Sequence, residues 1–533
     1  MSQANCQANS QANSQASQGS TPIPNNGKSV TIVGAGLAGS LLACYLADAG
    51  WYVSVFERRP DPRAKGYLGG RSINLALSIR GLLGLAGAGL DEHVSRRDAI
   101  RMPGRMIHLI TGSPVFQPYS SNPADAINSV SRGGLNLTLI NAAASRPNVD
   151  LFFDSPCVHA DLATATATFS RPDSITFKQS ANLLVGTDGA FSAVRSAFLI
   201  TDRFNFQQSY LEQGYKELYI PPANRIVLPH NALTPSASQD GSLDPAAFAL
   251  DPYALHIWPR GAAMMIALPN RDGSFTCTLF WPFQGEHSFQ SLEGTHLNTN
   301  PDPQEIEAFF DSHYPDAASL MPTLAQDFIK NPTSSLVTVR CSPWQRHGKS
   351  CLLGDAAHAI VPFYGQGMNA AFEDCLVLAQ MLALHADQRD ALEAYADARE
   401  PNANAIADMA LENFIEMRDL AGKADFQYRK KIEQTLHREL ASTIGERTTP
   451  QYNLVSFSTV PYWMAQRRGK EMLTLLTHVA QAVPAPAIPS PSLPSSSLSI
   501  NSSSDWTRAI ISAALPLYNS ITPIPSNAAL SHT

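Results

Sequence analysis

Apolar residues occur along the first part of the chain in short runs, separated by glycine-rich turns and helical patterns. An apolar run at residues 30–33 precedes a glycine-rich turn and a helical pattern, and a second apolar run covers residues 53–56. This order of strand, turn, helix and strand is typical of a parallel βαβ unit. Further runs predict a helix at residues 135–144 and strands at residues 115–119 and 149–153. The pattern therefore predicts an α/β fold for this part of the chain.

The pattern changes character between about residue 205 and residue 285. The segments ALHIWPR, MMIAL and FTCTLFWPF, within residues 254–283, are rich in β-forming residues and predict an antiparallel sheet. Near residue 336 the chain returns to alternating strands and helices, and residues 401–469 have a helical pattern. We therefore predict a discontinuous Rossmann-type domain with an inserted antiparallel-sheet domain, followed by a helical C-terminal region.

The predicted domain boundaries follow these changes of pattern. They are a low-complexity tail at 1–27, the Rossmann-type domain at 28–204 and 334–400, the inserted β-rich domain at 205–333, the helical region at 401–480 and a Pro/Ser-rich tail at 481–533. Residues 1–27 repeat QANS-like units and cannot bury enough apolar surface to fold. Residues 223–246 are rich in Pro, Ser and Asp and have the composition of a surface insertion.

The composition excludes several classes of function. The net charge is −7 and the pI is about 6.1, so the chain has no basic excess that would indicate nucleic-acid binding. Its seven cysteines include no CxxC pair, which argues against a zinc site and predicts a reducing compartment, with the cysteines packed in the core. The N-terminal segment has no apolar signal core and no Arg or Lys before Lys28. No apolar run approaches the ~20 residues that a membrane span requires.

The turn after the first apolar run reads GAGLAG, from Gly34 through Gly36 and Leu37 to Gly39. This spacing between a strand and a helix is the dinucleotide-binding fingerprint, whose three glycines permit a tight turn, close approach of a pyrophosphate and close helix packing. The helix N-terminus adds roughly half a positive charge. Glu57 lies 18 residues after Gly39 (57 − 39), where an acid can bind a ribose hydroxyl. These features predict a dinucleotide site rather than a glycine-rich turn without a ligand.

Two later segments also place glycine and aspartate directly after a buried strand. The first is GTDG at residues 186–189, which contains Asp188, and the second is GDAAH at residues 354–358, which contains Asp355. The loop PFYGQG at residues 362–367 then opens a long helix and offers bare backbone N–H groups to a ligand. Together with the first fingerprint, these segments resemble the motifs of the class A flavoprotein monooxygenases, the aromatic hydroxylase family.

The resemblance implies tightly bound FAD, with NADPH and O2 as co-substrates. In that family the first fingerprint binds the ADP half of FAD, the GTDG segment helps to hold FAD and NADPH, and the GDAAH aspartate contacts the flavin ribitol. The positions that match FAD-binding residues are Gly34, Gly36, Leu37, Gly39, Glu57, Arg58, Ala76, Arg132, Asp188, Asp355, Gly367, Met368 and Asn369. No side chain is assigned a catalytic role, because the cofactor supplies the oxidant. We expect His358 to pack behind the flavin loop and His256 to lie in the antiparallel sheet.

A closer resemblance connects the chain to the kynurenine-hydroxylating members of this family. It is carried by GRSINLALS, ALHIWPR, the long segment around GDAAH, and NFIEMR, and it covers roughly residues 28–468. It implies the conversion of L-kynurenine to 3-hydroxy-L-kynurenine, on the route from tryptophan to NAD. The residues that match substrate-binding positions are Arg105, Tyr119, Asn413 and Tyr452. An arginine suits the substrate carboxylate because its guanidinium stays charged and offers two parallel donors.

Two other functions stay open at this point. A hydroxylase of another aromatic acid, of the salicylate or hydroxybenzoate type, would share every flavin motif but not the combination of ALHIWPR, NFIEMR and RMIH. A flavin-bearing interaction protein without catalysis is the second alternative, and the intact GDAAH and PFYGQG segments argue against it. Eukaryotic members usually end in a membrane anchor, so the resemblance alone implies the outer mitochondrial membrane, facing the cytosol. Residues 506–518 are the candidate for an interfacial attachment.

Overall fold

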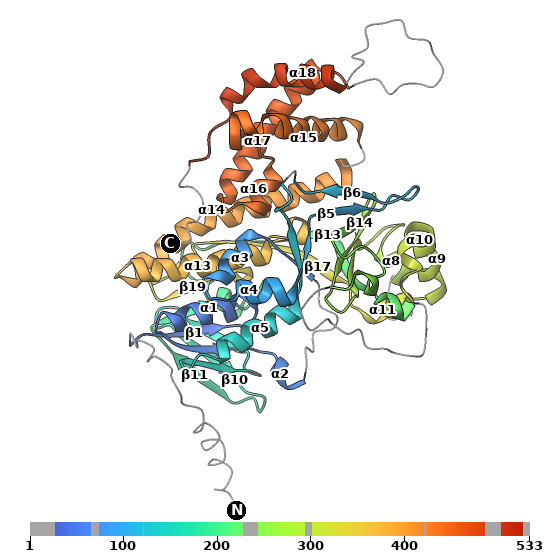
Figure 1. Ribbon diagram of the computed structural model, residues 1–533. Coiled ribbons are helices and arrows are strands. Elements are labelled where there is room, and N and C mark those ends of the chain that lie inside the picture. Colours follow the sequence, from blue (N-terminus) through green and yellow to red (C-terminus); the bar gives the residue numbers. More distant parts are fainter. Residues whose placement is uncertain are drawn as a thin grey trace, which may run out of the picture.

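The computed structural model describes residues 27–65, 74–120, 122–226, 243–293, 301–420, 423–485 and 503–525. Three sequence predictions fall wholly or largely outside these residues: the N-terminal repeat, most of the 223–246 insertion and the Pro/Ser-rich stretch at 486–502. The described residues form two large sheets, two three-stranded sheets and a group of C-terminal helices (Figure 1).

The first large sheet has six strands and forms the core of the Rossmann-type unit. In spatial order they are β18 (Gln345–Arg346), β19 (Ser350–Leu352), β12 (Leu183–Gly186), β1 (Ser29–Val33), β2 (Tyr52–Phe56) and β8 (Val149–Phe152). All pairs except β18–β19 are parallel, so most of these strands are covered on both faces and read as apolar runs. Because β12 pairs with both β1 and β19, the three glycine-rich segments that follow these strands meet at one edge of the sheet.

Three helices pack against this sheet in one hydrophobic core: α1 (Leu37–Asp48), α5 (Arg132–Ala144) and α13 (Gly367–Leu384). Their buried apolar positions, such as Leu41, Leu139 and Leu378, face Val30 and Val185 of the central strands. The strand–turn–helix units predicted from the sequence are therefore confirmed, and the fold is the predicted Rossmann-type α/β class.

The second large sheet has seven strands. In spatial order they are β17 (Ser334–Ser342), β13 (Asn205–Ile220), β16 (Phe275–Pro282), β15 (Ala263–Pro269), β14 (Ala254–Arg260), β5 (Gly104–Ile107) and β6 (Val115–Pro118). Its centre is antiparallel as predicted, but β14 pairs in parallel with β5, with Ala254 opposite Gly104. Residues 104–118 and strand β17 therefore belong to the second sheet, although the predicted boundaries at residues 204 and 334 assigned both to the Rossmann-type domain.

Helices cover one face of the second sheet at the right of Figure 1: α8 (Phe289–Glu293), α9 (Pro303–His313), α10 (Pro315–Ala318) and α11 (Leu324–Lys330). On β13, Leu218 and Ile220 point into this core, where they join Phe310 and Phe328. Tyr215 lies on the opposite face and joins a second core with residues of α13 and the C-terminal helices. This opposite face is therefore turned toward the Rossmann-type unit.

Two small antiparallel sheets complete the β structure. They consist of β9 (Cys157–Asp161), β10 (Thr166–Ser170) and β11 (Thr176–Ser180), and of β3 (Asn74–Leu77), β7 (Ile127–Ser131) and β4 (Ala99–Met102). The β3–β7–β4 sheet joins the two large sheets. Asn74 Nδ2 donates to the Pro269 carbonyl oxygen of the second sheet at 3.0 Å, while Leu77 is buried in the core of the first.

The C-terminal region is helical, as predicted. Its helices are α14 (Gln388–Ile415), α15 (Ala424–Ile444), α16 (Gln451–Phe457), α17 (Tyr462–Ala482) and α18 (Ser503–Ala514), and α15, α17 and α18 stand above the sheets in Figure 1. Helix α18 lies within the predicted Pro/Ser-rich tail, and its apolar side chains Trp506 and Ile510 are buried with Tyr518 in a core shared with α15 and α17. These residues are therefore not available for the predicted interfacial attachment. Every helix in the described part of the chain is either too short or too polar to span a bilayer.

The six cysteines of the described chain are free thiols. Five of them are buried, which confirms the predicted core packing: Cys44, Cys277, Cys341, Cys351 and Cys375. Burial raises the pKa of the Cys44 thiol to about 11, so this side chain stays neutral at physiological pH.

Candidate active site

In the turn between β1 and α1, backbone atoms leave no room for a Cβ at two of the three glycines, whereas the space next to the third glycine is empty. Gly34 has a φ of +106°, and a Cβ there would lie 2.7 Å from the Thr187 carbonyl oxygen. A Cβ at Gly39 would lie 2.0 Å from the Gly34 carbonyl oxygen, whereas a Cβ at Gly36 would meet no atom within 4 Å. The open position lies next to Leu37, the first residue of α1. This space at a helix N-terminus fits the pyrophosphate of FAD.

Glu57 holds the same turn from the end of β2. Its carboxylate is buried and accepts hydrogen bonds from the Ala35 backbone N at 2.9 Å and from the Arg59 backbone N at 3.0 Å. Arg59 Nε also donates to it at 3.0 Å. Arg58, which was predicted to contact the cofactor, is exposed beside it. A carboxylate has about four acceptor positions, so Glu57 can still accept from a ribose hydroxyl.

Replacing Gly36 by alanine tests this cradle. The backbone there is extended (φ −72°, ψ −173°), so we expect the free energy of unfolding of the FAD-free protein to change by less than about 0.5 kcal/mol. The added methyl group would occupy the open space, so we expect FAD affinity to fall about tenfold or more, a loss of about 1.4 kcal/mol. Flavin titration and urea unfolding measure the two quantities separately. Unchanged FAD affinity in Gly36→Ala would exclude this turn as the pyrophosphate site.

Asp188 of the GTDG segment is turned into the protein. Its carboxylate accepts from the Ser192 hydroxyl and from the Ala193 and Val194 backbone N at 2.6 and 3.2 Å, at the start of α6 (Ala193–Phe198). Burial raises its pKa, and these hydrogen bonds oppose the shift. Arg195 then donates to the Ala356 carbonyl oxygen at 2.8 Å. The Asp188 side chain therefore organises the segment beside GDAAH, and this role was not foreseen when it was matched to a cofactor-binding position.

Asp355 begins α12 (Asp355–His358) at the end of β19. Its side chain is exposed and makes no hydrogen bond or ion pair with the described residues. A Cβ on the neighbouring Gly354 would lie 3.4 Å from Cβ of Ala38, so this carboxylate stands beside the first fingerprint. A Cβ on Gly365 would lie 2.9 Å from Cβ of Ala76, which brings the PFYGQG loop against β3. The exposed carboxylate is suited to accept hydrogen bonds from ribitol hydroxyls.

Asn369 locks the PFYGQG loop in place. Its Nδ2 donates to the carbonyl oxygens of Ala76 at 2.8 Å and Gly365 at 2.9 Å. Its Oδ1 accepts from the Ser78 backbone N at 3.0 Å. The buried side chain is therefore used within the protein, and the first-turn backbone N–H groups of α13, beginning at Gly367 and Met368, are the groups left to face a cofactor.

Glu217 is a charged residue of this region that was not singled out in the sequence. It lies on β13 on the same face as Tyr215, turned toward the Rossmann-type unit, whereas Lys216 points away and donates to the Phe328 carbonyl oxygen at 2.9 Å. Burial raises the pKa of Glu217 to about 7, and the positive charge of Arg132 at the start of α5 opposes this shift. Side chains alternate between the two faces of the sheet along the segment YKELYI. This alternation was the sequence signal that could have placed Glu217 on the face turned toward the Rossmann-type unit.

A fully buried ion-pair network lies behind the flavin loop. Asp374 accepts from Arg399 Nε at 2.7 Å, from His358 Nε2 at 2.5 Å and from the Gly354 backbone N at 3.2 Å. The His358 ring stacks on Trp344 at a centroid distance of 5.0 Å. His358 therefore packs behind the loop, as predicted. The acidic pair in GMNAAFEDCL was the available signal for the network, since charges are rare within an otherwise apolar helix.

The network continues through Glu373 to the helix that carries Tyr452. Glu373 pairs with Arg80 Nη1 at 2.8 Å and with Arg399 Nη2 at 3.1 Å. Arg80, on α3 (Ile79–Ala86), also donates to the Val455 carbonyl oxygen of α16 at 2.9 Å. Its guanidinium lies 4.0 Å from the centroid of the Tyr462 ring. These contacts tie α3, α13 and α16 together and so position α16 relative to the flavin loop.

Three of the predicted substrate residues come together from distant parts of the chain. The Arg105 guanidinium, on β5, lies 5.2 Å from the ring centroid of Tyr119 and 4.7 Å from that of Tyr452. The two tyrosine rings stack at 5.5 Å with an interplanar angle of 19°. Tyr364 of the PFYGQG loop also stacks on the Tyr452 ring, and the centroids of these two rings lie 5.7 Å apart. The arginine and the flavin loop therefore flank the same tyrosine.

The electrostatics of this cluster favour an anion. Arg105 is half-buried and has no carboxylate partner among the described residues. Burial lowers its pKa, but Tyr452 and Tyr119 raise it by more, so the side chain stays charged. The Tyr119 hydroxyl is buried close to Arg105 and Tyr452 and makes no hydrogen bond of ordinary geometry with the described residues. A fixed cation beside an unsatisfied hydroxyl is an arrangement that a carboxylate ligand would complete.

Asn413, the fourth predicted substrate residue, supports the flavin loop. Its Nδ2 donates to the Phe363 carbonyl oxygen at 2.7 Å, and Phe363 stacks on Phe414 at 4.4 Å. The Asn413 carboxamide oxygen makes no hydrogen bond with the described residues and can accept one from a ligand. The structure thus places Asn413 at the loop beside Tyr364 and not in direct contact with Arg105.

A buried histidine pair is formed by His108, which directly follows β5, and His256 on β14. His256 is in the antiparallel sheet, as predicted, and its Nε2 lies 2.8 Å from the Asp251 carbonyl oxygen. Its Nδ1 lies 2.8 Å from His108 Nε2, and His108 Nδ1 lies 2.6 Å from Asp316 Oδ2. Burial lowers the pKa of His256 to about 4.

This depressed pKa predicts a loss of stability in acid. Between pH 6.5 and 4 the unfolded chain binds a proton at His256 that the folded protein does not, so the free energy of unfolding falls as the pH is lowered. The expected loss is about 3 kcal/mol over this range. Urea unfolding of wild type and His256→Gln at several pH values measures it, because the difference between the two proteins should shrink toward pH 4. A difference that does not depend on pH would refute the prediction.

The sequence profile of the FAD binding domain family matches residues 28–215 and 281–410. A kynurenine 3-monooxygenase of Myxococcus xanthus (strain DK1622) is 44% identical over 457 residues, which cover 86% of this chain and 91% of the relative. A kynurenine 3-monooxygenase of Dictyostelium discoideum is 43% identical over 455 residues, which cover 83% of this chain and 91% of the relative.

Solved structures show the same fold at lower sequence identity. The chain superposes on 2-methyl-3-hydroxypyridine-5-carboxylic acid oxygenase with a TM-score of 0.56 and 20% identity, over 74% of this chain and 94% of that one. It superposes on 2,6-dihydroxypyridine-3-hydroxylase of Arthrobacter nicotinovorans with a TM-score of 0.56 and 17% identity, over 75% and 95% of the two chains. At this identity the likeness concerns the fold.

Proposed function

Because the chain belongs to the kynurenine 3-monooxygenase family of FAD-dependent hydroxylases, we propose that Arg105 binds the carboxylate of L-kynurenine in the reaction that gives 3-hydroxy-L-kynurenine. The observation that carries this proposal is the Arg105 guanidinium, which has no carboxylate partner among the described residues and lies against the rings of Tyr119 and Tyr452. An amino-acid carboxylate would pair with it and accept from the Tyr119 hydroxyl. The aryl group would then extend past Tyr452 toward the PFYGQG loop, where Tyr364 and Asn413 lie.

The protein residues position the substrate and exclude water. When bound, FAD supplies the oxygen-transfer chemistry, with electrons from NADPH and an oxygen atom from O2. The ring carbon ortho to the amino group of kynurenine is already electron-rich, so no protein base is needed to ionise the substrate. Arg105 fixes one end of the substrate, and the tyrosine rings and the apolar residues around them, including Leu268, keep water from the ring.

We propose that FAD is held by the cradle at Gly36, the Glu57 and Asp355 carboxylates and the first-turn amides of α13. The open space at Gly36 and the unpaired Asp355 side chain support this assignment. We also propose a functional division in which residues 28–204 and 334–400 bind FAD and residues 205–333 supply the wall over the substrate. The extension of the second sheet by β5 and β6 adds Arg105 to that wall.

Product analysis tests the proposed function directly. Purified protein with FAD, NADPH and O2 is expected to convert L-kynurenine to a product heavier by one oxygen atom and to oxidise NADPH faster when kynurenine is present. Salicylate and 4-hydroxybenzoate serve as comparison substrates, because a hydroxylase of simple phenolic acids shares the flavin motifs. Hydroxylation of a phenolic acid with no reaction of kynurenine would overturn the proposal.

The location on the outer mitochondrial membrane stays a prediction from eukaryotic family members. Relatives named kynurenine 3-monooxygenase include bacterial proteins such as that of Myxococcus xanthus. The apolar side chains of Trp506 and Ile510 are buried in the C-terminal helical core. Cell fractionation of the tagged full chain is the measurement: recovery in the mitochondrial membrane fraction would support the predicted location, and recovery elsewhere would contradict it.

A further inference from the structure

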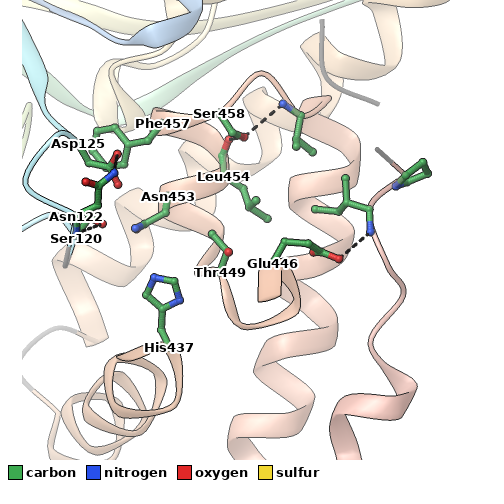
Figure 2. A pocket seen from close by; sticks show the side chains of 13 residues that line it. Ser120, Asn122, Asp125, His437, Glu446, Thr449, Asn453, Leu454, Phe457 and Ser458 are labelled. Atoms are coloured by element: carbon green, nitrogen blue, oxygen red, sulfur yellow. Dashed lines mark hydrogen bonds between the residues drawn. The ribbon is translucent and has the colours of Figure 1, made fainter. Parts of the chain in front are cut away.

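A cavity of about 490 Å³ lies beside the Arg105 cluster, between the segment after β6 and the C-terminal helices (Figure 2). Its polar lining residues include Ser120, Asn122, Asp125 and Asn453. Its apolar lining includes Phe457 and Leu454, which lie on the same helix, α16, as Asn453. The mechanism proposed above uses none of these side chains.

The Phe457 ring is shared between this cavity and the substrate cluster. Phe457 lines the cavity, and its ring centroid lies 6.0 Å from that of Tyr119 and 6.1 Å from that of Tyr452. Ser120 and Asn453 directly follow these two tyrosines in the chain and line the cavity themselves. The same two segments therefore present tyrosines to Arg105 and polar side chains to the cavity.

Two polar groups in the cavity have unused hydrogen-bonding capacity. Asn453 is only 8% exposed, and its carboxamide makes no hydrogen bond with the described residues. In Figure 2 its side chain points across the cavity toward Ser120 and Asn122. Asp125 accepts from Asn122 Nδ2 at 3.1 Å and has no cationic partner within the described part of the chain. An amide with no partner among the described residues, together with a carboxylate that has no cationic partner there, points to a ligand with a cationic group and a second polar group.

The other ionisable groups of the cavity do not neutralise Asp125. Glu446 is paired with Arg468 Nη2 at 2.9 Å and accepts from the Ile524 backbone N at 3.2 Å. Burial lowers the pKa of His437, so this ring is neutral near pH 7. Asp125 is therefore the unpaired charge that faces the cavity.

We propose that this cavity is an antechamber for an α-amino acid, in which Asp125 binds the ammonium group and Asn453 the carboxylate before the molecule passes Phe457 to Arg105. The inference rests on the proposed function and names the route by which its substrate reaches the site. The apolar wall at Phe457 and Leu454 accommodates the aryl group. Asp125 attracts the ammonium group of an α-amino acid. An aromatic acid that lacks an ammonium group carries only its negative carboxylate, which Asp125 repels.

The test compares two substrates in the Asp125→Asn holoenzyme. The substrates are L-kynurenine and its analogue without the α-amino group, 4-(2-aminophenyl)-4-oxobutanoate. We expect kcat/KM for kynurenine to fall about fivefold at low salt, with kcat unchanged, because the lost attraction slows association. For the analogue we expect kcat/KM to stay the same or to rise. The loss for kynurenine should shrink as ionic strength increases.

A matched variant separates the local effect from net charge. Asp150→Asn removes one charge from an exposed position on β8, at the far edge of the first sheet, and should leave both substrates unaffected. Flavin content and urea unfolding confirm that both variants are folded. An equal loss for kynurenine and the analogue in Asp125→Asn, or no loss for either, would overturn the antechamber while leaving the proposed function intact. Wild-type protein that does not hydroxylate kynurenine would overturn the proposed function, and the inference with it.

Discussion

Replacing Arg105 by alanine is expected to raise the KM for L-kynurenine about 100-fold while FAD stays bound. Loss of a desolvated guanidinium–carboxylate pair costs about 3 kcal/mol, which corresponds to a factor of roughly 100. The effect falls on binding because Arg105 contacts the tyrosine rings and none of the proposed FAD-binding residues. Steady-state NADPH oxidation coupled to product detection gives KM and kcat, and the visible absorbance of the purified protein reports the flavin.

Two further variants make the Arg105 result specific. Arg105→Lys keeps the positive charge but loses the two parallel donors, so we expect an intermediate rise in KM of about tenfold. Arg96→Ala removes an exposed arginine whose ion pair among the described residues is with Glu92 at 3.8 Å, and it should behave as wild type. Unchanged kinetics in Arg105→Ala would remove this residue from the substrate site, whatever the reaction proves to be.

The largest expected effect on stability comes from Asp374→Asn. The change removes the charge that the buried His358 faces and one of the two carboxylates that pair with the buried Arg399, so we expect the free energy of unfolding to fall by about 3–5 kcal/mol. Burial raises the pKa of Asp374, but His358 and Arg399 lower it by more. The stabilisation by the Asp374 carboxylate is therefore fully present above pH 3.8, which is the pKa of this group in the unfolded chain. It is lost as the pH falls below that pKa. Urea unfolding at pH 7 measures the change.

Glu393→Gln is the matched control for this variant. Glu393 lies exposed on α14 and accepts one hydrogen bond from Gln345 Nε2 at 3.3 Å, so its replacement should change the free energy of unfolding by less than about 0.5 kcal/mol. Asp374 also accepts from the Gly354 backbone N, and we therefore expect Asp374→Asn to retain FAD less well. Equal stability of the two variants would show that the buried network is not needed to hold α13 and α14 together.

Local patterns were sufficient for the parts of the site that lie on one continuous segment. The strand at Ser29–Val33, the three glycines and Glu57 are close in sequence, and the geometry of a βαβ unit relates them directly. The order of apolar runs also predicted the antiparallel sheet and the helical C-terminal region correctly. These features depend on backbone conformation and on strand and helix periodicity, which neighbouring residues establish among themselves.

The other parts of the site could be placed only from the packing of segments that are far apart in the sequence. Arg105 and Tyr452 are 347 residues apart (452 − 105), and only the pairing of β5 with β14 and the anchoring of α16 by Arg80 bring them together. The same holds for Asp188, whose carboxylate caps α6, and for Trp506, which is buried against α15 and α17 rather than exposed. Neither pairing between distant strands nor burial against a distant helix leaves a local signal, because it depends on which apolar faces meet when the whole chain is folded.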